Sequence, residues 1–98
     1  MKRIISIATL RKFWDAHPDS EMALKSWYDY VKEFDWDQPA DVKNSFRNAS
    51  ILKGGRIVFN IKGNQYRLVT DINYQKKWVY IRFIGTHKEY DRIDANEI

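Results

Sequence analysis

The chain has 98 residues, of which 44% are hydrophobic and 15% aromatic, so it can form one domain around a single core but is too short for two. With 31% charged residues and no apolar run near the roughly 18 to 20 residues that cross a bilayer, the sequence excludes a membrane-spanning helix. The lack of cysteine excludes a thiolate nucleophile, a disulfide framework and a metal site built from cysteine.

The beginning of the chain resembles a short secretory signal without completing one. The segment MKRIISIATL has basic residues followed by apolar ones, but Arg11, Lys12 and Asp15 arrive before the apolar part reaches a normal length. No cleavage site of small residues follows. We therefore expect a cytoplasmic protein that does not associate with a membrane.

The net charge of +4 is concentrated in the second half of the chain. Basic and acidic side chains balance between residues 1 and 50, whereas Asp71 is the single acid from 51 to 88. The basic residues of that segment are Lys53, Arg56, Lys62, Arg67, Lys76, Lys77, Arg82 and Lys88. A one-sided positive field attracts phosphate backbones, although lysines that protect the edges of a solvated sheet would give the same bias.

The predicted elements begin with a short strand, KRIISI, at Lys2 to Ile7. A first helix, capped by Thr9, extends to about Ala16, because the residue before Pro18 is pushed out of the α region. Its apolar side chains recur at helical spacing and are Leu10, Phe13 and Trp14.

A second helix follows, capped by Asp19 or Ser20. Its apolar stripe has steps of three and four residues and consists of Leu24, Trp27, Tyr28, Val31 and Phe34. The two helices therefore predict a hairpin with an aromatic inner face, for which core packing is a better explanation than cofactor binding. From Trp36 to Ser50 the chain is polar and irregular, with a short helical turn expected from Pro39.

From Gly54-Gly55 onward the apolar pattern changes to a period of two, which is typical of strands. Three antiparallel strands are predicted at Arg56 to Lys62, Tyr66 to Asn73 and Trp78 to Ile84. The sequence therefore predicts one α+β domain over residues 1–98. The N-terminal strand and the helical hairpin are expected to pack on one face of an antiparallel sheet, and a short helical turn should follow the last strand.

Alternation assigns the side chains of these strands to two faces of the sheet. The face toward the helices is expected to hold Ile57, Phe59, Ile61, Leu68, Val79, Ile81 and Phe83. The opposite face is expected to hold Arg56, Asn60, Lys62, Arg67, Asp71, Trp78, Tyr80 and Arg82. An open face with cations between aromatic rings suits single-stranded nucleic acid, because the cations bind phosphates while the rings stack on bases.

The last predicted strand is followed by GTHKEYDRID, which brings titratable side chains to the rim of the same face. Cleavage of RNA without a metal needs an acceptor for the 2′-hydroxyl proton, a donor for the leaving 5′-oxygen and cations for the phosphorane. His87 titrates in a suitable range, Tyr90 could orient a nucleotide or donate a proton, and Asp91 could fix the His87 tautomer. The positive charge could come from Lys62, Arg67 and Lys88.

Each of these residues also has a structural explanation. A histidine after a strand is often a hydrogen-bonded loop residue, and the segment Glu89 to Arg92 could be only a capped terminal turn. His17 and His87 are far apart in the sequence and neither has a histidine at i+4, so we expect no metal site. No phosphate-binding glycine loop, nucleophile elbow or pair of catalytic carboxylates is present.

Two long segments in the second half of the sequence resemble those of a known family. They are FNIKGNQYRL, at residues 59–68, and YIRFIGTHKEYDRID, at residues 80–94. Together with Ile72-Asn73-Tyr74 between them, they make most of residues 55–94 similar to the HigB branch of the RelE-like toxins, the ribonuclease partners of bacterial toxin–antitoxin pairs. The first half shares the helical hairpin and the His17-Pro18 break with that family.

The resemblance implies a RelE-like α+β fold and a toxin that enters the A site of the 70S ribosome and cuts translated mRNA without a metal or other cofactor. It also implies a neutralising HigA-type antitoxin with a helix-turn-helix domain, through which alone operator DNA would be bound. By this likeness, the terminal motif of the family corresponds to His87, Tyr90 and Asp91, and its basic sheet positions correspond to Lys62 and Arg67.

These considerations define the expected site. The expected catalytic residues are His87, Arg67, Tyr90 and Lys62, with Asp91 orienting the histidine. The expected RNA-binding residues are Arg56, Asn60, Arg82, Lys88 and Tyr80.

Two other functions would use the same basic face. A non-catalytic RNA-binding module would block the ribosomal A site by charge and stacking, and would need no group that titrates near neutrality. An interaction protein would use its basic groove only for an acidic segment of a partner. Intact messages on stalled ribosomes would indicate the RNA-binding module, whereas cleaved messages indicate an enzyme. Loss of ribosome association at moderate salt, with partner binding retained, would indicate the interaction protein.

Overall fold

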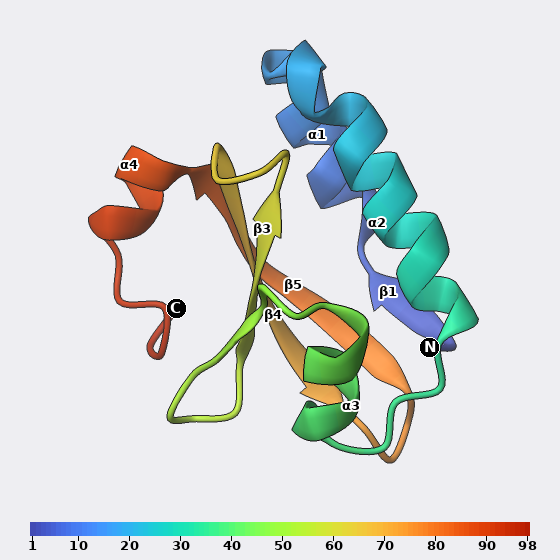
Figure 1. Ribbon diagram of the computed structural model, residues 1–98. Helices are drawn as coiled ribbons and strands as arrows, with labels where there is room; N and C mark the ends of the chain where they lie inside the picture. The colour runs from blue at the N-terminus through green and yellow to red at the C-terminus, as the bar shows by residue number, and fades with distance from the viewer.

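The computed structural model describes residues 1–98 and shows a central sheet with helices on both sides (Figure 1). The strands are β1 (Arg3–Ile5), β2 (Ser50–Ile51), β3 (Ile57–Ile61), β4 (Tyr66–Asn73) and β5 (Trp78–Thr86). The helices are α1 (Ile7–Ala16), the 3-10 turn η1 (Pro18–Ser20), α2 (Glu21–Glu33), α3 (Pro39–Ser45) and α4 (His87–Asp91). The predicted α+β class, with a helical hairpin against one face of the sheet, is confirmed.

The sheet has five strands in the order β1–β5–β4–β3–β2. The pairs β2–β3, β3–β4 and β4–β5 are antiparallel, as predicted. Strand β1, however, runs parallel to β5, with Arg3 opposite Trp78, so the sheet is mixed. Parallel neighbours need a long connection, and here most of the chain separates the two strands, so local alternation gives no indication of the pairing.

The first helix begins earlier than predicted. Ser6 occupies its N-cap position, and Thr9 lies inside the first turn. The helix ends at Ala16 as expected, and Pro18 starts the 3-10 turn that leads into α2. Ser20 is the N-cap residue of α2, although its Oγ donates a hydrogen bond back to the His17 carbonyl at 2.7 Å and does not cap the helix.

The main core lies between the helical hairpin and the sheet, where both apolar stripes are buried as predicted. Its buried helix residues include Leu10, Trp14, Leu24, Trp27 and Val31. These pack against Phe59 of β3, whose ring centroid lies 5.3 Å from that of Trp27. Burial of these large side chains is the main favourable contribution to folding. None of the helices is long and apolar enough to cross a membrane.

A β-bulge changes the face of Phe83 from the one that alternation predicts. The register shifts between Val69 and Thr70, because Val69 pairs with Phe83 whereas Thr70 pairs with Ile81. Arg82 is the extra residue, so the side chains after it are displaced to the other face. Phe83 therefore lies away from the helical hairpin, and Ile84 packs against the main core in its place.

The face that was expected to be open is partly covered by the C-terminal segment. A second, smaller core contains Val58, Val69 and Ala95, with Leu52, Phe83 and Tyr90 packed against it. Figure 1 shows α4 and the C-terminal tail on the opposite side of the sheet from α1 and α2. The segment thereby fixes the position of α4 on the sheet.

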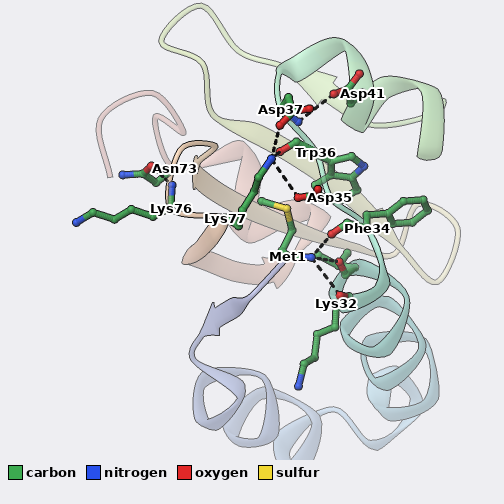
Figure 2. A network of polar contacts seen from close by, with 11 residues as sticks. Met1, Lys32, Phe34, Asp35, Trp36, Asp37, Asp41, Asn73, Lys76 and Lys77 are labelled. Carbon is green, nitrogen blue, oxygen red and sulfur yellow. Dashed lines mark hydrogen bonds and ion pairs between the residues drawn. The ribbon is translucent and has the colours of Figure 1, made fainter.

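A polar network joins β1 and the β4–β5 turn to the end of α2 (Figure 2). The Lys77 ammonium donates to the Trp36 carbonyl at 2.8 Å and pairs with Asp35 at 3.1 Å and with Asp37. These partners raise the pKa of Lys77, with the Asp37 hydrogen bond as the main cause. The Met1 amino group donates to the last carbonyls of α2, among them Val31 at 3.1 Å. Lys77 therefore acts within the fold and is not part of a free basic surface.

Candidate functional site

Four of the side chains predicted to act on RNA, His87, Lys88, Tyr90 and Asp91, belong to α4, directly after β5. Thr86 is the N-cap residue of α4 and forms a capping box with Glu89. Its Oγ1 accepts from the Glu89 N–H at 3.2 Å, while Glu89 Oε1 accepts from the Thr86 N–H at 2.8 Å. These bonds to Thr86 are the main reason why the pKa of Glu89 is lowered. The capping box fixes the start of α4, so His87 becomes its first residue.

His87 and Asp91 form a pair one helical turn apart. His87 Nδ1 lies 3.0 Å from Asp91 Oδ2, and both side chains are about half exposed, at 52% and 57%. An Nδ1–H that donates to this carboxylate leaves Nε2 available to a substrate. Asp91 is thus close enough to His87 for the orienting role that the sequence predicts.

Arg67 belongs to β4 and lies on the face of the sheet away from the helical hairpin. Its Cα partners across the sheet are Asn60 on β3 and Gly85 on β5, so the three residues form one row. The His87 N–H donates to the Gln65 carbonyl at 3.1 Å, which ties the start of α4 to the start of β4. The Arg67 guanidinium donates to the Asn64 carbonyl at 2.9 Å. The structure thus brings Arg67 and His87 to the same end of the sheet.

Tyr90 is part of the small core as well as part of α4. Its partly buried side chain packs against the cluster of Val58, Val69 and Ala95. The orientation of the phenol is therefore set by the sheet below it. A side chain held in this way can position a nucleotide without losing much conformational entropy.

The structure places Lys62 away from the expected basic face. Lys62 has a φ of 52°, in the left-handed region, at the end of β3. Its ammonium pairs with Asp19 Oδ2 at 3.0 Å, and Asp19 Oδ1 accepts from the Tyr66 hydroxyl at 2.6 Å. Alternation could not predict this direction, because the turn conformation breaks the period of two. Lys62 in this conformation contacts the helical layer and not the row of Arg67.

Asp19 also affects the titration of its neighbours. The hydrogen bond from Tyr66 is the main cause of the lowered pKa of Asp19, and the bond from Lys62 adds to it. The same bond raises the pKa of Tyr66. These three side chains therefore form a small network at the end of the sheet that carries α4.

Further along the face, Asp71 lies between two arginines. The Arg82 guanidinium is 3.5 Å from Asp71 Oδ2, and Arg56 Nε is 4.0 Å from the same atom. The Arg56 side chain is only 16% exposed, and its Nη1 donates to the Ala95 carbonyl at 2.9 Å. Arg82 also lies over the Tyr80 ring, 5.7 Å from its centroid. Arg82 and Tyr80 are thus accessible, whereas Arg56 holds the C-terminal segment.

The remaining predicted residues lie at the margins of the site. Lys88 is exposed on α4. Asn60 lies in the row of Arg67 and donates to the Asn48 carbonyl at 3.2 Å. His17 stacks on Phe13, with ring centroids 4.4 Å apart, which gives it a packing role. No group of three or more histidine or acidic side chains is placed to hold a metal ion.

Two cations near Trp78 were not predicted as part of the site. Arg3 and Lys76 each lie 5.1 Å from the centre of a Trp78 ring, and Trp78 lies 6.2 Å from Tyr80. Arg3 reaches this place through the parallel pairing of β1 with β5. The sequence shows only that Arg3 is a basic residue at the start of an apolar segment. The pairing of that segment with β5 could not be predicted from the local sequence.

The α+β architecture and the basic, aromatic sheet face are those of a small RelE-like protein. The family model of the HigB toxin, described as a RelE-like toxic component of a toxin–antitoxin system, matches residues 20–93. The chain belongs to this family.

Curated relatives agree with the family assignment. The mRNA interferase HigB of Escherichia coli O6:H1 (strain CFT073) is 30% identical over 92 residues, which cover 92% of this chain and 89% of the relative. The mRNA interferase toxin HigB of Escherichia coli K12 is 27% identical over 94 residues, covering 94% and 90%. The mRNA interferase HigB of Shigella flexneri gives the same values. The similarity extends over nearly the whole chain and includes the helical hairpin.

Proposed function

We propose that this protein is a cytoplasmic toxin that cleaves mRNA in the A site of the 70S ribosome and thereby inhibits translation. The observation that carries the proposal is the His87–Asp91 contact of 3.0 Å at the rim of a basic sheet face. Membership in the HigB family supports it, as does the activity for which the relatives are named, mRNA interferase.

The reaction is an attack of a 2′-hydroxyl on the adjacent phosphorus. The new O2′–P bond forms, the P–O5′ bond breaks, and the products carry a 2′,3′-cyclic phosphate and a 5′-hydroxyl. One proton leaves the 2′-oxygen and one reaches the 5′-oxygen, and His87 and Tyr90 carry these transfers. Asp91 holds the imidazole through Nδ1, so Nε2 faces the substrate.

The phosphorane needs positive charge, which Arg67 supplies from the row next to Gly85. Lys88, exposed on α4, adds to the field. Lys62 must release Asp19 before it can contact a phosphate. These side chains supply the charge stabilisation in the proposed reaction.

The rest of the face binds the message. Arg82 over Tyr80 offers a cation and a ring to a phosphate and a base, and Asn60 lies at the outer edge. Arg56 contributes mainly by holding the C-terminal segment, although its charge adds to the attraction. In the cell, a HigA-type antitoxin with a helix-turn-helix domain neutralises the toxin, and operator DNA is bound through that antitoxin.

The test is brief induction of the wild type and of His87→Ala, followed by mapping of mRNA 5′ ends. We expect cuts within reading frames that fall by about 10²- to 10⁴-fold in the variant. A translation inhibitor that empties the ribosomes should remove them as well. Gln75→Ala, at an exposed position in the β4–β5 turn, is the control and should cleave as the wild type does.

Other outcomes would replace the proposal. Intact messages despite arrested growth would indicate a module that blocks the A site without cleavage. Equal cleavage by the wild type and His87→Ala would show that the site is elsewhere. Cleavage that persists when the ribosomes are empty would remove the ribosome from the mechanism.

A further inference from the structure

A pocket of about 300 Å³ lies between α1 and the last residues of β5. One wall belongs to α1 and its C-cap and consists of Thr9, Lys12, Phe13, Ala16 and His17, and the other consists of Ile84 of β5 and Glu89 of α4. Strand β1 pairs with β5 only as far as Tyr80, so no strand lies beside this part of the β5 edge. None of the residues to which the proposed function assigns a role lines the pocket, which is therefore an additional feature of the site.

The α1 wall of the pocket carries an ordered pair of rings. Phe13 and His17 are stacked, with their ring centroids 4.4 Å apart and their planes inclined by 23°. The buried Tyr66 ring meets both of them edge-on, at 5.3 Å and 5.6 Å, and its hydroxyl is held by Asp19. A ring pair that is fixed in this way can bind another flat ring at little cost in conformational entropy.

Two charged groups of the pocket have unused hydrogen-bonding capacity. Glu89 Oε1 accepts from the Thr86 N–H at 2.8 Å, but Oε2 accepts no hydrogen bond within the chain. Lys12 is exposed and belongs to none of the ion pairs of the chain. The pocket therefore offers a carboxylate oxygen as an acceptor and an ammonium group as a donor to a ligand that lies against the rings.

Glu89 also connects the pocket with the proposed site of cleavage. It follows His87 by two residues, and a Cβ atom placed on Gly85 would lie 3.1 Å from its Oε1. Gly85 belongs to the row of Arg67, in which the proposed reaction places the phosphate. Glu89 thus borders both the pocket and this row. An RNA strand with a phosphate at Arg67 can therefore place an adjacent base over the edge of β5.

We infer that this pocket takes one guanine base of single-stranded RNA, beside the phosphate that is cut. The inference rests on the proposed function for the position of that phosphate. Guanine N1–H and N2–H donate to the Glu89 carboxylate, the Lys12 ammonium donates to O6, and the purine ring lies against the Phe13–His17 pair. The volume of the pocket suits a single base, because it is at the lower end of the roughly 300 to 1,000 Å³ of small-ligand sites.

The carboxylate explains why guanine is preferred to the other bases. Guanine alone presents two adjacent N–H donors on one edge of the ring. Adenine and cytosine would place an unprotonated ring nitrogen against Glu89, and uracil would place carbonyl oxygens there. A carboxylate that meets an acceptor instead of a donor loses its hydrogen bond and is repelled, so the pocket should select by base.

Binding of short RNA to the purified protein tests the inference without any cleavage. The probe is a fluorescein-labelled pentamer of 2′-fluoro uridines, which has no 2′-hydroxyl to attack, with guanine, hypoxanthine, adenine or uracil as the central base. Hypoxanthine is guanine without the N2 amino group. Fluorescence anisotropy gives the affinities. The wild type should bind the guanine pentamer about 10- to 100-fold more tightly than the other three.

Two variants change the pocket from different sides. Glu89→Gln retains an oxygen for the Thr86 N–H, since glutamine also forms a capping box, but replaces the free acceptor by a donor. Ala16→Leu fills the pocket from an exposed position at the end of α1. The matched controls are Glu97→Gln, in the exposed C-terminal segment, and Ala8→Leu, at an exposed position of α1 outside the pocket.

Both pocket variants should lose the preference for guanine and bind the all-uridine pentamer as the wild type does, whereas both controls should keep the preference. Equal affinities of the wild type for the guanine and hypoxanthine pentamers would overturn the inference. A preference that survives in both pocket variants would overturn it as well. Free GMP that competes as well as the guanine pentamer would assign the pocket to a nucleotide and not to an RNA strand.

Mapping of mRNA 5′ ends in cells separates this inference from the proposed function. Guanine should adjoin the cuts of the wild type more often than those of Glu89→Gln, while the total number of cuts stays similar. Cuts that show no preference for an adjoining guanine would overturn the inference and leave the proposed function intact. Selective binding of the guanine pentamer without any cuts in cells would keep the guanine pocket and contradict the proposed function.

Discussion

The ring of Phe83 lies over Gly85, so a Cβ atom placed on Gly85 would come within 2.4 Å of Phe83 Cζ. The bulge at Arg82 turns Phe83 to this face, and Gly85 sits in the same row as Arg67. The glycine therefore serves packing next to the proposed site, and no special φ value is involved.

We expect Gly85→Ala to destabilise the protein by about 1 to 3 kcal/mol, since the added methyl group must displace a packed ring. Urea unfolding measures the change. Gly54→Ala is the control, because a Cβ there would make only an ordinary contact of 3.8 Å. Equal unfolding midpoints for the two variants would show that the ring moves aside freely.

The Asp91 carboxylate should contribute to cleavage through His87. Asp91→Asn keeps the shape of the side chain but removes the charge that holds the imidazole. We expect cleavage to fall by about tenfold, less than for His87→Ala, with an unchanged melting temperature because both side chains are exposed. Quantified 5′ ends at fixed sites give the rate, and Asp94→Asn is the control. In the double variant His87→Ala/Asp91→Asn, a further drop equal to that of Asp91→Asn alone would rule out a role through the histidine.

Asp19 should make stability depend on pH in acid. Its pKa is lowered in the folded state, mainly by the Tyr66 hydrogen bond, so its contribution is present above the unfolded value of 3.8. The contribution is lost as the pH falls through the lower folded value. Between about pH 5 and about pH 2, Asp19→Asn should therefore lose less stability than the wild type. Urea midpoints at both pH values test this, with Asp29→Asn as the exposed control. Parallel losses in the wild type and both variants would contradict the prediction.

Asp19 also tests the role of Lys62. If Lys62 acts on the phosphate, Asp19→Ala should release it and leave cleavage intact or increased, while Lys62→Ala should reduce cleavage. If the Lys62–Asp19 ion pair is purely structural, Asp19→Ala and Lys62→Ala should both change stability and leave cleavage unchanged. Measuring cleavage and urea midpoints on the same two proteins separates these outcomes.

Arg56 and Arg82 should behave differently although both were predicted to bind RNA. Arg56→Ala removes the bond to the Ala95 carbonyl from a side chain that is only 16% exposed, and should cost about 1 to 3 kcal/mol. Arg82→Ala should change stability by less than about 0.5 kcal/mol. It should weaken binding of single-stranded RNA and reduce the slope of log affinity against log salt by about 0.7 to 1. Fluorescence anisotropy at several salt concentrations measures this slope for each variant. A loss of stability in Arg82→Ala together with a loss of RNA binding in Arg56→Ala would exchange the two roles.

The sequence predicts the parts of this fold that depend on local periodicity. The stripes of α1 and α2 and the alternation of β3 and β4 place Leu24, Trp27, Phe59 and Leu68 in the core. The row of Arg67 and the position of His87 after β5 follow from the same periodicity. The i,i+4 spacing of His87 and Asp91 allows their contact once the chain there is helical.

The remaining features depend on local backbone irregularities and on tertiary contacts, which the periodicity of the sequence does not indicate. A single extra residue at Arg82 reverses the face of Phe83, and a left-handed φ at Lys62 turns that side chain toward Asp19. The burial of Tyr90 and Arg56 depends on Ala95, which returns to the sheet from beyond α4. The contact between Arg56 and Ala95 joins residues that are 39 positions apart in the sequence.

The pairing of β1 with β5 determines when the sheet can be completed during synthesis of the chain. Arg3 to Ile5 remain without a strand partner until Trp78 to Tyr80 have been synthesised, and His87 follows only a few residues later. Contacts across so much of the chain slow folding, because the intervening segment must be closed into a loop first. A nascent chain therefore holds neither a finished sheet nor an assembled His87–Asp91 pair.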